Sequence, residues 1–191
     1  MYAQQFSRDE PPQRLSAQRW PRSLDGPVHA QDFVLGGGRS KCAMTLPTRQ
    51  DINVHDSLDE RSACEHFLGK TLQEAEALLR ENSLYYQEDL MFMGASAFRF
   101  YVQAAITYIQ SEAATGDSAI VSCFASILEH RLEYEAEELR PVADRLAAIC
   151  GYVIEHYSRF DLTPEIYCDI RPRFQKLQQT FLRQRANEEA G

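Results

Sequence analysis

Apolar side chains recur every three or four positions along most of this chain from residue 56 onward, and this spacing restricts its fold more than any other feature. The clearest run begins at Ser96 and places six apolar residues on one helical face: Phe98, Tyr101, Val102, Ala105, Tyr108 and Ile109. A helix with such a stripe buries it against a neighbour and leaves its polar face in water. The pattern therefore predicts packed amphipathic helices.

Start and stop signals divide this part of the chain. Asp56 or Ser57 caps a helix that runs to about Phe67 and ends before Gly69, and Thr71 with Glu74 forms a capping box for a helix that stops near Asn82. Further helices are predicted at Ser96, after Asp117, at Pro141, at Thr163-Pro164-Glu165, and around Phe174, Leu177 and Phe181.

An aromatic run over residues 84–94 lies between two of these helices. A single strand has no partner in this chain, so a packed loop or a helical turn is expected there. The predicted fold class is therefore all-α, with about six amphipathic helices packed as a single irregular bundle.

The first 55 residues differ from the rest. Five of the eight prolines and the run Gly36-Gly37-Gly38 lie within residues 1–50, without an apolar period. We expect a disordered arm at 1–55, a helical domain at 56–186 and a frayed tail at 187–191. The arm is either functional, with Trp20 as an anchor for a partner, or a non-native start, with Met44 as the true initiator.

Charge is divided unevenly along the chain. Residues 51–191 carry 13 basic and 24 acidic side chains, a net charge of −11. Such a body repels nucleic acid phosphate and anionic lipid, so neither partner is expected, whereas a basic protein partner is compatible with it. The alternative is a solvated acidic surface without a partner.

Apolar runs are too short to cross a bilayer, which takes about 20 residues, and no secretory signal follows Met1. The five cysteines show no metal-binding spacing. We therefore expect a cytoplasmic protein.

The charged stretch from His130 to Arg140, with Glu129 directly before it, holds the acidic candidate binding residues. Glu129, Glu133 and Glu137 are spaced four apart, and Glu138 lies beside them. They form either an exposed helix face or a docking patch for a basic partner.

Phe100 lies off the main apolar stripe of its helix. It either packs against a second neighbour or stands exposed beside Arg99 as an interface anchor.

Motifs for chemistry are missing. No GxSxG is present, and Ser40 precedes Lys41 where a phosphate loop needs the reverse order. In Glu65-His66, Glu129-His130 and Glu155-His156 the two residues are adjacent and point about 100° apart, so we interpret them as solvated helix ends. We expect no catalytic residue, no metal and no cofactor.

The stretch from Met91 to Ala105, MFMGASAFRFYVQAA, resembles a family of small bacterial helical proteins of unknown function. In that family an aromatic-rich loop precedes a helix that starts Phe-Arg-Tyr-Tyr-Leu-Pro-Ala. This chain has Phe100, Val102 and Gln103 where the family has tyrosine, leucine and proline. The resemblance implies a bacterial, cytoplasmic helical protein without a transferable catalytic motif, and small acidic helical proteins of this kind resemble immunity proteins.

The sequence thus favours a non-enzymatic helical protein-binding module, immunity- or antitoxin-like in its sharpest form. Two alternatives stay open. One is an enzyme with an unrecognised site between helices, which predicts a polar cleft containing a buried histidine or carboxylate. The other is a homodimer joined through the aromatic residues of 85–108.

Overall fold

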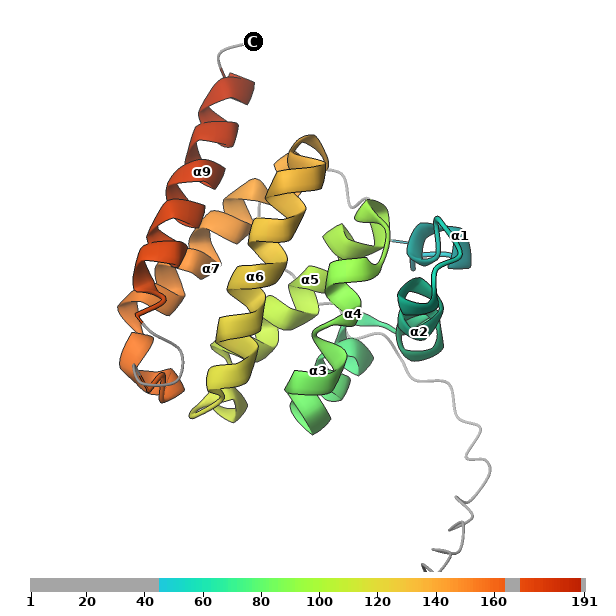
Figure 1. Ribbon diagram of the computed structural model, residues 1–191, viewed down its shortest axis with the longest axis horizontal. Helices are drawn as coiled ribbons and strands as arrows, with labels where there is room; N and C mark the ends of the chain where they lie inside the picture. Colours follow the sequence, from blue (N-terminus) through green and yellow to red (C-terminus); the bar gives the residue numbers. More distant parts are fainter. Residues whose placement is uncertain (1–44, 164–168, 190–191) are drawn as a thin grey trace, which may run out of the picture. The chain divides into compact units, whose positions relative to one another are not determined.

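A computed structural model describes residues 45–163 and 169–189, and all regular elements there are helical, which confirms the all-α fold class (Figure 1). The α-helices are α1 (Arg49–Ile52), α2 (Leu58–Phe67), α3 (Leu72–Tyr86), α4 (Asp89–Phe92), α5 (Ala95–Gln110), α6 (Ser118–Glu135), α7 (Ala143–Glu155) and α9 (Arg171–Glu189). Shorter 3-10 helices are η1 (Glu112–Ala114), η2 (Ala136–Val142) and η3 (Tyr157–Phe160).

The predicted starts of α2, α3 and α6 are confirmed by their caps, and of Asp56 and Ser57 it is Ser57 that caps α2. Ser57 and Thr71 each accept a hydrogen bond from the backbone N–H three residues on, and the glutamate there bonds back to them. Asp117 accepts from the backbone N–H of Ile120 at 3.1 Å. Gly69 and Gly116 take positive φ angles of 76° and 80°, which only glycine adopts without strain.

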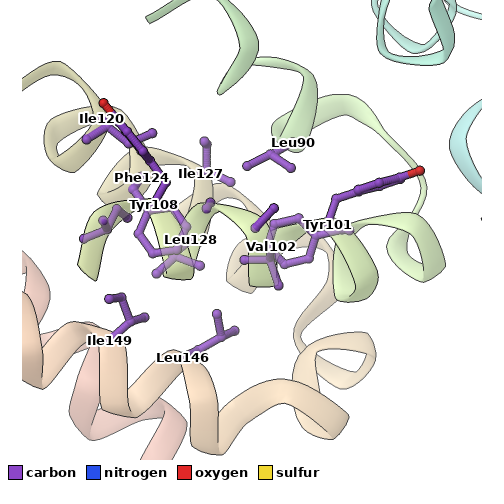
Figure 2. Close-up of a cluster of buried hydrophobic side chains, with 14 of the residues drawn as sticks. Leu90, Tyr101, Val102, Tyr108, Ile120, Phe124, Ile127, Leu128, Leu146 and Ile149 are labelled. Carbon is purple, nitrogen blue, oxygen red and sulfur yellow. The ribbon is translucent and has the colours of Figure 1, made fainter. Parts of the chain in front are cut away.

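The core lies where α5, α6 and α7 meet (Figure 2). The α5 stripe predicted from the sequence is buried along its whole length, and Ile120, Phe124, Ile127 and Leu128 of α6 pack with it. Leu146 and Ile149 of α7 close the cluster from the other side. α9 runs along α7 in Figure 1 and buries its predicted apolar residues Phe174, Leu177 and Phe181.

Two tyrosines of α5 tie this core to neighbouring elements. The Tyr101 hydroxyl donates to the carbonyl oxygens of Phe67 and Lys70, at 2.5 and 3.1 Å. The Tyr108 hydroxyl donates to Asp117 at 2.8 Å. Burial raises the pKa of each hydroxyl to about 12, because the phenolate would lose its hydration.

These tyrosines predict a loss of stability in alkali. A phenol that ionises near pH 10 when unfolded but near pH 12 when folded stabilises the protein fully below pH 10, and this stabilisation is lost as the pH rises through about 12. We expect the midpoint of urea unfolding to fall between pH 10 and 12. The fall should be shallower when Tyr101 and Tyr108 are both phenylalanine, and an equal fall in that variant would contradict this assignment.

The packed region begins earlier than the sequence indicates. α1 falls within residues 45–55, which the sequence assigned to the arm, and its Ile52 is fully buried. Thr48 and Asp51 form its capping box. A helix of four residues shows no period, so the apolar pattern could not reveal it. The remainder of the expected arm, Trp20 and Met44 included, lies outside the described residues.

Asn82 breaks α3 near the predicted place, but the helix resumes after it. Its backbone angles, φ −155° and ψ 85°, are non-helical. The Asn82 side chain then accepts from the backbone N–H of Tyr85 at 3.1 Å and caps one more turn. Together with α4, this turn accounts for much of the aromatic run, which is helical as expected and not a strand.

Two boundaries after α6 differ from the expectation, the start of α7 and the end of α9. Pro141 lies inside η2, and α7 begins two residues later at Ala143. Helix α9 begins at Arg171 and holds Pro172 in its first turn, where proline is tolerated. It continues to Glu189, into the tail that was expected to fray at 187–191. The helix predicted from Thr163-Pro164-Glu165 onward falls on residues 164–168, which lie outside the described part of the chain.

Candidate functional site

A groove of about 530 Å³ lies between the α1–α2 connection, the start of α5 and the end of α6. We call it the α5–α6 groove. Its lining comes from four stretches of chain: Val54, His55, Ser57 and Glu60; then Met91 to Ser96 and Arg99; then His130, Arg131, Tyr134 and Glu135; and lastly Glu138. It therefore depends on contacts between distant parts of the sequence.

Arg131 holds one wall of this groove in place. Its side chain is 2% exposed, and it donates to the carbonyl oxygens of Leu90, at 2.8 Å, and Met93. It also pairs with Glu135, and its guanidinium lies 4.6 Å from the centre of the Phe98 ring. Burial lowers the pKa of Arg131, and the ion pair with Glu135 opposes that shift. A buried cation thus joins α6 to the turn before α5.

Gly94 brings α1 against the start of α5. Its backbone N–H donates to the carbonyl oxygen of Ile52 at 3.0 Å. Hydrogen bonds from Thr48 lower the pKa of the Asp51 carboxyl, and Ser96 and Arg99 of α5 lower it further. Asp51 therefore places a carboxylate near the positive end of the α5 dipole. This contact fixes the α1–α2 connection, which carries Val54 and His55 into the groove.

Two residues predicted from the sequence meet in the groove. Arg99 binds the Glu138 carboxylate at 2.5 Å and the Glu138 carbonyl oxygen at 3.1 Å. Beside this pair, Tyr134 is 69% exposed and Val54 is 54% exposed, so the groove offers apolar surface to solvent. The rings of Tyr134 and His130 lie 4.7 Å apart.

The acidic residues do not form one stripe as the sequence predicted. The backbone turns out of the helix at Glu135, with φ −139° and ψ 34°, so Glu137 lies on η2. Glu129 pairs with Arg173 at 2.6 Å, and Glu137 pairs with Arg140 at 2.6 Å. Glu133 is exposed on α6. Much of the predicted acidic patch is therefore neutralised within the chain.

Phe100 is 9% exposed, so of the two alternatives for this residue the packed one holds. Its ring contacts Tyr101 edge to face, with the ring centres 4.9 Å apart.

The sequence did not indicate three residues that line the groove: Val54, His55 and Tyr134. Of these three, only Tyr134 had a signal in the sequence that could have marked it as a binding residue, because it is an aromatic residue within a charged stretch.

The surroundings of His66 also differ from the sequence prediction of a solvated helix end. It lies in the last turn of α2, as expected, but its side chain is only 20% exposed. Nδ1 of His66 lies 2.7 Å from Oδ2 of Asp89, which is itself buried. His66 is therefore a bonded, half-buried residue and not a solvated helix end.

Two kinds of feature are absent from residues 45–163 and 169–189. None of the helices there combines the length and apolarity needed to cross a bilayer. No group of three histidine, cysteine or acidic side chains in this part of the chain is arranged to hold a metal ion.

Comparisons with protein-family models, curated proteins and solved structures found no match. The family resemblance of Met91 to Ala105 stays a sequence-based expectation.

Proposed function

We propose that this chain is a helical protein-binding module that docks a basic partner at the α5–α6 groove. The observation that carries this proposal is Tyr134, a large aromatic side chain that is 69% exposed on the wall of a groove. Exposed tyrosines in such positions are common anchors of protein interfaces, because they bury much area at a low entropic cost.

The charges around Tyr134 favour a cationic partner. Glu133 precedes Tyr134 on the exposed side of α6, and the Glu138 side chain, 57% exposed, lines the groove. A lysine or arginine of the partner can lie over the Tyr134 ring and near both carboxylates. The net charge of −11 over residues 51–191 attracts a basic partner over a longer range.

Ion pairs within the chain favour some candidate contact residues over others. Glu129 and Glu137 already bind arginines of this chain, so a partner would have to displace those arginines to use them. We therefore assign direct contact to Tyr134 and Glu133. Glu138 is also paired, with Arg99, but unlike Glu129 and Glu137 it lines the groove, so it supplies negative charge beside the docked partner. Arg99 orients Glu138 through their ion pair, and Phe100 supports the core beneath.

The most specific version of this proposal is that the partner is a basic toxin and that the chain acts as an immunity- or antitoxin-like protein. This version rests on the acidic charge of the chain and on analogy with small acidic helical immunity proteins. The free thiols of Cys64, Cys123 and Cys150 fit a reducing cytoplasm, and burial raises the pKa of Cys150 to about 12.

Replacing Tyr134 by alanine is expected to abolish capture of the partner. The tagged chain would be purified from its source cell in native conditions, and bound proteins would be quantified by mass spectrometry. Leu182→Ala is the matched control, because Leu182 is a large exposed apolar residue on α9, outside the groove. A stoichiometric basic protein lost with Tyr134→Ala and kept with Leu182→Ala is the expected result.

Two outcomes would overturn the proposal. One is that no protein is captured in a manner that depends on Tyr134. The other is that light scattering shows a second copy of this chain as the species lost in the Tyr134→Ala variant, which would make the groove a homodimer contact.

A further inference from the structure

A second, smaller pocket of about 110 Å³ lies on α2, beside the end of α3 and α4. Asp59, Ser62 and His66 of α2 line it, together with Tyr85, Glu88 and Asp89. The protein-binding proposal uses none of these side chains. Three of them lie within hydrogen-bond distance of one another in series, as a catalytic triad does.

This series of hydrogen-bonding groups runs from Asp89 through His66 to Tyr85. Nδ1 of His66 lies 2.7 Å from Oδ2 of Asp89, and Nε2 lies 3.5 Å from the Tyr85 hydroxyl. A carboxylate oxygen only accepts, so Nδ1 carries the hydrogen of the neutral ring. Nε2 is then an acceptor facing the phenolic O–H, which is the arrangement of a nucleophile, a base and a group that orients the base.

The surroundings fix the ring and leave the nucleophile accessible. The His66 ring packs edge to face against Tyr85 and Tyr86, with ring centres 5.2 and 5.1 Å away. Asp89 is buried, whereas Tyr85 is 56% exposed. The cap that Asn82 supplies to the last turn of α3 places Tyr85 above the histidine. A substrate can therefore reach the hydroxyl while the base stays oriented.

We propose that Asp89, His66 and Tyr85 form a nucleophilic site that takes an acyl group from small, neutral, activated esters onto the Tyr85 oxygen. Nε2 of His66 accepts the phenolic proton as the Tyr85 oxygen bonds to the carbonyl carbon. The bond from that carbon to the leaving oxygen breaks, and His66 returns the proton to it. The products are O-acyl-Tyr85 and an alcohol, with no oxidant or reductant needed.

The pocket restricts the class of ester. Its volume admits a short acyl group and little more. The carboxyl groups of Asp59 and Glu88 face it alongside Asp89, so anionic substrates are repelled. His66 and Tyr85 are the other titratable groups that line it. This site does not depend on the proposed protein-binding groove.

The chain supplies an internal control for the test. Tyr134 is also exposed and also lies beside a histidine, His130, but no carboxylate is bonded to that histidine in the described part of the chain. The whole protein would be treated with p-nitrophenyl acetate, and acetylation at each tyrosine would be followed by mass spectrometry over time. We expect Tyr85 to react about tenfold faster than Tyr134, which is less than the roughly 100-fold that general-base catalysis usually contributes, because the 3.5 Å contact is long.

Variants separate the base from the residue that positions it. His66→Gln should bring the Tyr85 rate down to that of Tyr134. Asp89→Asn should also slow it, and nitrogen NMR of the His66 ring should show the hydrogen moved from Nδ1 to Nε2, which a purely structural role would not require. Equal rates at Tyr85 and Tyr134 in the unaltered protein, or a Tyr85 rate unchanged by His66→Gln, would overturn the proposal.

Discussion

Replacing Arg131 by alanine is expected to lower the free energy of unfolding by about 3–5 kcal/mol, because it leaves two buried carbonyl oxygens unsatisfied at roughly 1–3 kcal/mol each. The substitution leaves the carbonyl oxygens of Leu90 and Met93 without their donor. It also leaves Glu135 without its cation and removes the contact with the Phe98 ring. Each of these losses falls where α6 meets the turn before α5. Urea unfolding followed by circular dichroism measures the change.

Two further variants show which part of Arg131 matters. Arg131→Met keeps an apolar stem of similar length, so a large remaining loss assigns the effect to the donors and not to a cavity. Arg140→Ala removes an arginine from the exposed pair with Glu137 and should cost less than about 1 kcal/mol. Losses of equal size for Arg131→Ala and Arg140→Ala would contradict the assignment.

Gly94→Ala is expected to destabilise the protein by about 1–3 kcal/mol, the usual cost of overpacking. A methyl group there would meet the backbone oxygen of Asp51 and, at 2.5 Å, Cγ2 of Val54. The oxygen belongs to α1 and cannot rotate away, so α1 and the connection behind it have to move. Because Val54 lines the α5–α6 groove, binding at the groove should weaken as well.

Gly151→Ala is the matched control for that substitution. A methyl group at Gly151 would meet the side-chain nitrogen of Gln178 at 2.7 Å, and Gln178 can rotate away. Gly151 lies inside α7, where alanine favours the helix by about 0.5–1 kcal/mol. We expect Gly151→Ala to be neutral or stabilising in the same unfolding assay. Equal destabilisation by both substitutions would contradict the close approach of α1 to Gly94.

Most of the fold could be predicted from the sequence because its signals are local. Capping boxes join residues three positions apart, and the α5 stripe repeats every three or four residues, so Thr71–Glu74 and the run after Ser96 were both correctly interpreted. α1 was missed because one buried isoleucine in a four-residue helix leaves no period to detect.

The candidate site was only partly predictable because its contacts are not local. Arg99 and Glu138 were each singled out, but they are 39 residues apart and their ion pair is a property of the packed chain. Arg131 reaches Leu90 across 41 residues. His66 and Asp89 are 23 residues apart, and each appeared ordinary in its own segment. Local periodicity does not encode which polar groups meet.

The stretch around Tyr134 shows that a local pattern misleads where the helix that it assumes comes to an end. The charged stretch around it predicted a solvent-facing helix, and α6 does continue through it to Glu135. The change to η2 at Glu135 then ends the acidic stripe and places Glu138 in the groove. A carboxylate spacing of four is therefore insufficient to define a binding face unless the helix continues.

The most direct test of the protein-binding account is the dissociation constant of the captured basic partner, measured with the unaltered chain and with Tyr134→Ala. We expect the variant to bind at least roughly 30-fold more weakly, as loss of an interface hot spot does, and to keep its thermal midpoint. Leu182→Ala should bind as the unaltered chain does. Equal affinities of the unaltered chain and Tyr134→Ala would contradict the assignment of the α5–α6 groove as the docking site.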